Sequence, residues 1–421
     1  MAHSDKPKFG IVVGGGPAPG LNGVISAATI EAINNGYEVV GIMDGFKWLA
    51  QGDTSHVINL TIEDVSRVHI RGGSILRTAR TNPTKSEEMM TNVIDSLLAL
   101  NIGHLITIGG DDTAYTSSQV NDKAAGRIAT AHVPKTIDND LPLPASIPTF
   151  GYETARQEGH HIIKNMSEDA RTTGRWYFIV AMGRTAGHLA LGIGKSAGAT
   201  VTIIPEEFGS RDVSIREVCD ILEGSIIKRI ANGNDFGVAI IAEGVASRLT
   251  EDALKEIGEV ELDEHGHVRL SEVDLGEVCK SVVRKSLAER GIDMTIVSKD
   301  LGYELRCADP NPFDAEYTRD LGYGAVKFLL QGGTAAMITI QGGVLKPIRF
   351  HEIQDPETHR TRVRLVDVHG ESYEVARKYM IRLEPEDFEN EATYGPLAEA
   401  ANLSVEDFAK RFSYLKGTPR P

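Results

Sequence analysis

The sequence has few cysteines and no long hydrophobic run. Its three cysteines, Cys219, Cys279 and Cys307, are too few and too scattered for a disulfide framework or a zinc site. No apolar stretch approaches the roughly 20 residues that a membrane-spanning helix needs. Residues 1–8 are polar and do not have the pattern of a secretory signal. We therefore expect a cytoplasmic protein with no membrane association.

Basic residues are in the minority. There are 44 Lys and Arg against 59 Asp and Glu, which gives a formal net charge of −15 with neutral histidines. This balance argues against binding to nucleic acid, because neutralising its phosphates takes a surplus of positive charge. Small anionic ligands stay possible, since they require only a local positive pocket. With 41% hydrophobic residues, the chain can bury a large core.

Short apolar segments alternate with helical patterns along most of the chain. Runs of strand length cover residues 9–13, 38–43, 104–108, 127–133, 176–181, 200–204, 237–242 and 336–340. Helical spacing covers residues 21–35, 89–100, 213–231 and 275–291. This alternation predicts an α/β fold, with mostly parallel sheets covered by helices on both faces. We expect two doubly wound, three-layer lobes at 1–150 and 151–343, followed by a C-terminal extension, 344–421, that packs back on them and ends in a frayed tail.

Prominent polar residues follow the predicted strands at their carboxyl ends. In open parallel sheets ligands bind at this edge, because loops and helix N-termini converge there. Each residue alone could be a turn or cap residue. However, all of them follow the carboxyl end of a predicted strand, which favours a shared site. These residues are Asp111, Asp112, Lys135, Arg184 and Glu243.

The loops at these strand ends have the composition of a phosphate site. The glycine-rich segment 14–20 allows an anion to approach the backbone at a helix N-terminus, although its spacing matches neither the dinucleotide nor the Walker pattern. Asp111 and Asp112 could bind Mg²⁺ that is also bound by the phosphates of a ligand. The alternative role, capping a helix, requires only one carboxylate and does not explain the pair. Asp138 is placed to accept a proton from a hydroxyl substrate. Together with nearby arginines, these loops predict phosphoryl transfer to a phosphorylated acceptor.

These motifs resemble those of the phosphofructokinase family. Six segments are similar to motifs of that family. They are residues 15–22 (family motif G-G-D-A-P-G-M-N), 71–80 (R-G-G-x-x-L-x-x-A-R), 109–113 (G-G-D-G-S), 134–140 (P-G-T-I-D-N-D), 182–184 (M-G-R) and 301–306 (L-G-H-I-Q-R). The matches follow the family's order from residue 9 to about residue 341. The segment after residue 343 extends beyond the resemblance.

The resemblance implies a role for each matching residue. Asp138 is expected to be the base for the 1-hydroxyl of fructose 6-phosphate, and Asp111 to serve Mg²⁺. The lobe at 1–150 is expected to bind the phosphate donor through Gly15, Gly16, Arg80, Gly110 and Thr113. Sugar-phosphate binding is expected at Thr136, Ile137, Arg175, Met182, Gly183, Arg184, Glu243, Tyr303, Glu304, Leu305 and Arg306, of which Tyr303 replaces the family's histidine. A homodimer or homotetramer is implied, because family residues like Arg175 reach a neighbouring subunit's site.

Two departures indicate the pyrophosphate-dependent branch of the family. The ATP-using enzymes have glycine where Asp112 and Lys135 stand. A carboxylate at Asp112 would occupy and repel the place of a nucleotide's α-phosphate, whereas Lys135 can neutralise charge on the transferring and leaving phosphates. We therefore predict reversible, pyrophosphate-dependent phosphorylation of fructose 6-phosphate to fructose 1,6-bisphosphate and phosphate, a reaction of glycolysis and gluconeogenesis.

Three alternatives stay open from the sequence. An ATP-dependent kinase of the same fold would bind nucleotide. A dinucleotide-binding oxidoreductase would use residues 14–20 with Asp44 as the ribose acid, against the spacing of its last glycine. A catalytically silent sugar-phosphate sensor would not need Asp111 and Asp138 together.

Overall fold

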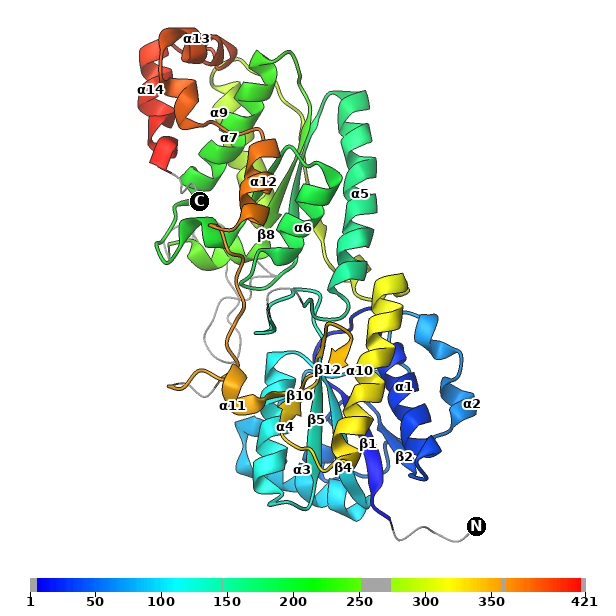
Figure 1. The fold of residues 1–421 in the computed structure, drawn as a ribbon. Coiled ribbons are helices and arrows are strands. Elements are labelled where there is room, and N and C mark those ends of the chain that lie inside the picture. Colours follow the sequence, from blue (N-terminus) through cyan, green and yellow to red (C-terminus); the bar gives the residue numbers. More distant parts are fainter. Residues whose placement is uncertain (1–5, 145–146, 251–273, 358–359, 418–421) are drawn as a thin grey trace. The chain divides into compact units, whose positions relative to one another are not determined.

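The computed structural model describes residues 6–144, 147–250, 274–357 and 360–417. The chain forms two compact units (Figure 1). Unit 1 consists of Met1–Ala155 and Tyr303–Arg364, and unit 2 of Arg156–Gly302 and Leu365–Pro421. Each unit contains a mostly parallel sheet with helices, so the predicted α/β class is confirmed. No helix among the described residues is long and apolar enough to cross a membrane.

The units differ from the predicted lobes of 1–150, 151–343 and 344–421 because both are discontinuous in sequence. Residues 303–364 return to unit 1, where they supply two helices and two strands of its sheet. Residues 365–421 belong to unit 2. The segment expected to be a single C-terminal extension is therefore divided between the units.

Unit 1 is built on a seven-stranded sheet with the order β13-β10-β5-β4-β1-β2-β3. The five inner strands are parallel, and β13 and β3 are antiparallel edge strands. The strands are β1 (Lys8–Val13), β2 (Val39–Ile42), β3 (Val57–Leu60), β4 (Ile102–Gly109), β5 (Ala129–Pro134), β10 (Ala336–Met337) and β13 (Ile348–Arg349). A separate hairpin pairs β11 (Ile340–Gln341) with β12 (Val344–Leu345). The predicted strand at 336–340 is thus shorter in the structure.

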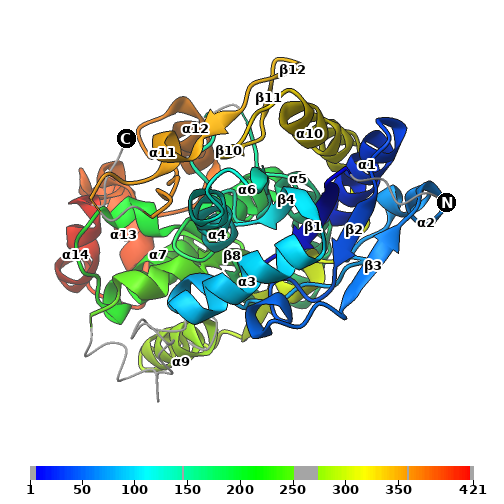
Figure 2. The ribbon, with the colours of Figure 1, turned by 90° about the horizontal axis from the view of Figure 1, so that it is seen from below.

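Helices cover both faces of this sheet. On one face, α1 (Leu21–Asn34) lies beside α10 (Pro312–Leu330), as Figures 1 and 2 show, and both pack on buried side chains such as Phe9 and Ile11 of β1. On the other face, α3 (Glu87–Ala99) and α4 (Asp111–Lys123) pack on Val12 and Val40. The short helices α2 (Ile62–Val65) and α11 (Phe350–Ile353) complete the unit.

Unit 2 contains a four-stranded parallel sheet with the order β7-β8-β6-β9. The strands are β6 (Trp176–Ala181), β7 (Val201–Ile203), β8 (Gly237–Ala242) and β9 (Ile296–Leu301). One face is covered by α7 (Ile215–Ala231) and α9 (Leu275–Ala288), on which α13 (Glu391–Ala400) and α14 (Val405–Phe412) pack. Beside the sheet lie α5 (Tyr152–Thr173), which starts in unit 1, α6 (His188–Ala197) and α12 (Glu371–Tyr379).

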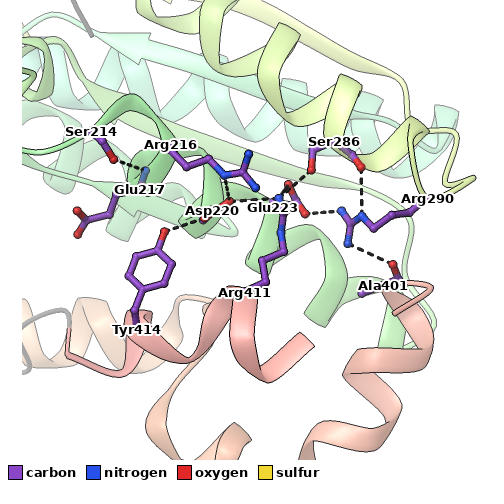
Figure 3. A network of polar contacts seen from close by, with 10 residues as sticks. All are labelled: Ser214, Arg216, Glu217, Asp220, Glu223, Ser286, Arg290, Ala401, Arg411 and Tyr414. Atoms are coloured by element: carbon purple, nitrogen blue, oxygen red, sulfur yellow. Dashed lines mark hydrogen bonds and ion pairs between the residues drawn. The ribbon is translucent and has the colours of Figure 1, made fainter. Parts of the chain in front are cut away.

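A buried ionic network fastens the last helices to unit 2 (Figure 3). The Glu223 side chain is 1% exposed and binds Arg290 and Arg411, the latter at 2.8 Å. Asp220 binds Arg411 at 3.3 Å and accepts a hydrogen bond from the Tyr414 hydroxyl at 2.7 Å. Because α7, the residue Arg290 that follows α9, and α14 all contribute charges, the network fixes the position of α14 against α7.

We expect Arg411→Leu to lower the free energy of unfolding by about 1–3 kcal/mol, because it leaves two buried carboxylates with fewer charged donors. Arg171→Leu is the matched control, since Arg171 makes an exposed pair with Glu168 on one helix face, and such pairs contribute about 0–1 kcal/mol. Urea unfolding of both variants measures the difference. Equal losses would show that the network does not hold the C-terminal helices.

Candidate functional site

The carboxyl ends of β1, β4 and β5 bring three of the predicted loops together in unit 1. Thr113, at the start of α4, is buried against the backbone at the ends of β1 and β4. A Cβ atom at either Gly14 or Gly109 would clash with its hydroxyl oxygen. Glycine at both strand ends therefore allows the glycine-rich loop and the start of α4 to approach closely.

Lys135 links the three loops. Its side chain is 4% exposed, and its Nζ donates a hydrogen bond to the carbonyl of Gly16. A Cβ atom at Gly15 would lie 3.5 Å from the same Nζ. The backbone nitrogen of Lys135 donates to the carbonyl of Gly109 at 2.8 Å. A positive charge is thus held next to the two glycines expected to bind the donor.

Two arginine-bearing segments reach the same loop. Ala79 pairs with Gly14 in a β-bridge, and its carbonyl accepts from the Gly15 nitrogen at 3.0 Å, which places the exposed Arg80 one residue away. Arg306 lies on the other segment, with its guanidinium carbon 3.6 Å from where a Cβ of Gly16 would be. Arginines suit this position because their planar donors bind phosphate bidentately.

The segment 303–306, which is expected to bind the sugar phosphate, forms a short turn beside this loop in unit 1. Arg306 lies over the exposed ring of Tyr303, 4.7 Å from its centroid. Glu304 is exposed, whereas Leu305 is fully buried and Ile137 is 5% exposed. Leu305 and Ile137 can therefore offer a substrate little beyond their backbone groups.

Asp111 and Asp112 are the first two residues of α4, where unpaired N–H groups favour anions. Asp111 is half-buried and Asp112 is exposed. The described residues contain no group of three or more His, Cys, Asp and Glu arranged to hold a metal ion. Two carboxylates without a full cage still fit Mg²⁺, which commonly takes one or two protein carboxylates and completes its shell with substrate phosphates and water.

Asp138 lies in a tightly bonded loop after β5 and is 7% exposed. Its backbone nitrogen donates to the hydroxyl of Thr136 at 3.0 Å. Thr149 donates from its hydroxyl to the carbonyl of Thr136 at 2.7 Å and from its nitrogen to Oδ1 of Asn139 at 3.0 Å. Asn139 has a φ of 57°, a left-handed conformation that such bonds must maintain. The loop is therefore preorganised around Asp138.

His132 lies in β5 directly beneath these loops. Complete burial is the main reason that its pKa is lowered to about 3; the charge of nearby Lys135 acts in the same direction, whereas a hydrogen bond with the backbone of Gly109 and the charge of Asp111 oppose the shift. The ring is therefore neutral at physiological pH, and its Nδ1 lies 2.9 Å from the hydroxyl of Thr107.

This histidine should make the protein less stable in acid. The unfolded chain binds a proton below about pH 6.5, but folded His132 does not until about pH 3, so stability falls as the pH decreases through this window. We expect the wild type to lose up to about 1.4 kcal/mol per pH unit more than His132→Gln. Urea unfolding between pH 7 and pH 4 measures both slopes. Parallel slopes would show that His132 is not buried in its neutral form.

In unit 2, Met182, Gly183 and Arg184 follow β6. Arg184 is exposed and has a φ of 54°. Glu243, at the end of β8 and 8% exposed, accepts through Oε1 from the backbone nitrogens of Gly183 at 3.0 Å and Arg184 at 2.6 Å. One oxygen of Glu243 thus shapes the Arg184 loop, a role that the sequence analysis did not predict.

The five strand-end residues belong to two sheets. Asp111, Asp112 and Lys135 are in unit 1, and Arg184 and Glu243 are in unit 2. Arg175 precedes β6 and so lies at the opposite end of this strand from Met182. Its Nε is 4.0 Å from a carboxylate oxygen of Asp169.

Glu206 holds the Arg184 loop as well but was not predicted from the sequence. Its Oε1 accepts from the backbone nitrogen of Gly187, which ends the Arg184 loop, at 2.9 Å and from that of Val366 at 3.0 Å. Burial raises the pKa of Glu206. Because Glu206 follows β7, the strand-end argument that found Glu243 could have found it as well.

The family profile described as Phosphofructokinase matches residues 8–329. The chain belongs to the phosphofructokinase family. It is 53% identical, over 98% of its length and 99% of the relative, to the pyrophosphate–fructose 6-phosphate 1-phosphotransferase of Thermotoga maritima. The identity to the protein of the same name from Naegleria fowleri is 51%, over 97% of this chain and 96% of the relative. Both matches therefore include most of the segment after residue 343.

A solved structure confirms the fold. The pyrophosphate-dependent phosphofructokinase from Marinobacter aquaeolei aligns with a TM-score of 0.66 at 16% identity, over 90% of this chain and 92% of that one. At this identity the likeness concerns the fold alone.

Proposed function

We propose that the chain is an enzyme that transfers a phosphoryl group from pyrophosphate to the 1-hydroxyl of fructose 6-phosphate, giving fructose 1,6-bisphosphate and phosphate. The names of the two relatives that are more than half identical support this activity. The observation that carries it in the structure is the buried ammonium of Lys135 beside Gly15 and Gly16, with Asp112 at the start of α4.

Within unit 1, the donor phosphates would bind the backbone of Gly15, Gly16, Gly110 and Thr113, where the N-terminus of α4 favours negative charge. Mg²⁺ bound by Asp111 would neutralise phosphate charge. Lys135 and Arg80 would stabilise the charge that develops on the transferring and leaving phosphates.

Asp138 would act as the base. The oxygen of the 1-hydroxyl attacks the phosphorus of pyrophosphate, the bridging P–O bond breaks, phosphate leaves and the hydroxyl proton passes to Asp138. Thr136 and the backbone of Ile137 would orient the sugar, and Arg306 would bind its 6-phosphate. The reaction should run in both directions, because the phosphoryl donor and product are of similar energy.

Sugar-phosphate binding is also proposed for a loop of unit 2. Met182, Gly183 and Arg184 would bind fructose 6-phosphate in the loop that Glu243 holds. The same proposal includes three further points. Arg175 would reach the site of a neighbouring subunit, the chain would therefore form a homodimer or homotetramer, and the protein would be cytoplasmic.

Phosphorus NMR tests the reaction directly. Wild-type protein with Mg²⁺, pyrophosphate and fructose 6-phosphate should produce equal amounts of phosphate and fructose 1,6-bisphosphate, and should regenerate pyrophosphate when supplied with these products. Phosphate release without a new sugar phosphoester would reduce the activity to pyrophosphate hydrolysis and overturn the proposal.

A further inference from the structure

Arg364 lies in the segment after residue 343, for which the sequence analysis found no role. Its guanidinium is half-buried and faces the stretch that directly follows Asp138 in the chain. It donates from Nε to the carbonyl of Asn139 at 3.0 Å, and from Nη1 to three further carbonyls at 3.3, 3.4 and 2.8 Å, those of Leu143, Pro144 and Ile147.

Two more bonds tie the same arginine to the loop. Nη2 of Arg364 donates to Oδ1 of Asn139, the oxygen that also accepts from the Thr149 nitrogen. The backbone nitrogen of Arg364 donates to the carbonyl of Asp140 at 2.7 Å. Arg364 thus binds both residues that follow Asp138.

These bonds act at a residue with a left-handed backbone conformation. Asn139, with its φ of 57°, is held on its carbonyl and on its side chain by the same guanidinium. Asn adopts this conformation more readily than most residues, and bonds to both its carbonyl and its side chain stabilise it there. The guanidinium of Arg364 donates to four carbonyls, and a planar group with five N–H donors is the side chain best suited to satisfy several at once.

Burial lowers the pKa of Arg364, and the nearby Asp140 opposes this shift. The guanidinium therefore lies in a partly dry site next to an acidic residue. There its hydrogen bonds compete less with water than they would on an open surface.

We propose that Arg364 is a positioning residue of the phosphotransferase, which holds the Asp138 carboxylate in its reactive orientation by fixing the conformation of Asn139 and Asp140. The inference rests on the proposed function, in which Asp138 is the base. It gives the segment after residue 343 an indirect part in catalysis, through the position of Asp138.

Kinetics of Arg364→Ala test this role. We expect its turnover to fall about 10- to 100-fold, because small displacements of a reacting group are costly, while the KM values for pyrophosphate and fructose 6-phosphate stay within about twofold. Millimolar guanidinium should restore part of the turnover. Arg364→Lys should lie between wild type and Arg364→Ala, since one ammonium cannot satisfy all the acceptors.

Arg362→Ala is the matched control. Arg362 is exposed, lies two residues away and donates to the carbonyl of Glu352, outside the loop. It should keep wild-type turnover and gain nothing from guanidinium.

Turnover within twofold of wild type in folded Arg364→Ala would overturn the inference, and so would an equal loss in Arg362→Ala. If Arg364→Ala does not fold, Arg364→Lys decides, and wild-type turnover in this variant would overturn the inference. An active wild type with an unaffected Arg364 variant contradicts this inference alone. A wild type that transfers no phosphate to fructose 6-phosphate overturns the proposed function and this inference with it.

Discussion

Asp138→Asn is expected to lower forward turnover about 10²- to 10⁴-fold, the usual contribution of a general base. The amide keeps the size of the side chain but cannot take the hydroxyl proton. The loop should keep its shape, because its bonds to Thr136, Thr149 and Arg364 do not use the Asp138 carboxylate. Steady-state kinetics with saturating pyrophosphate measures turnover, and fructose 6-phosphate binding should change little.

Asp122→Asn is a suitable control, since Asp122 is an exposed carboxylate near the far end of α4. It should retain wild-type turnover. Turnover of Asp138→Asn within twofold of wild type would remove Asp138 from the mechanism.

Lys135 and Asp112 should have separable effects on the choice and use of the donor. Lys135→Met preserves most of the buried side chain but removes the charge beside Gly15 and Gly16, so we expect about 10²- to 10³-fold lower turnover with pyrophosphate. Asp112→Gly removes a carboxylate that would repel a nucleotide's α-phosphate. Its turnover with ATP should rise from undetectable to weak, because water screens part of the repulsion at this exposed position.

These effects are measured as turnover with each donor. The wild type, both single variants and the double variant are compared. If Asp112→Gly is folded and saturable by fructose 6-phosphate but gains nothing with ATP, Asp112 does not select the donor. If Lys135→Met keeps full turnover with pyrophosphate, the buried charge does not act on the transition state.

The sequence predicted the local parts of the fold well because buried parallel strands are uninterrupted apolar runs. The predicted strands at 176–181 and 237–242 coincide with β6 and β8. It missed β9, whose residues Ser298, Lys299 and Asp300 are polar because this strand lies at the edge of its sheet and is only partly buried.

Long-range pairing was not predictable from local patterns. Nothing near residue 336 specifies that β10 pairs with β5, some 200 positions earlier, and this pairing assigns 303–364 to unit 1. Arg364 is a similar case, because it is separated by 225 positions from Asn139, which it holds. By contrast, Asp111, Lys135 and Asp138 stood out because each lies within four residues of the end of a recognisable strand.

The measurement that tests the central claim most directly compares donors with the unaltered protein. Initial rates of fructose 1,6-bisphosphate formation are recorded at saturating fructose 6-phosphate and Mg²⁺, with either pyrophosphate or ATP over the same concentration range. We expect saturable turnover with pyrophosphate and a kcat/KM for ATP at least about 100-fold lower, since a like charge or clash against the wrong ligand costs several kcal/mol. A kcat/KM for ATP equal to or above that for pyrophosphate would contradict the account.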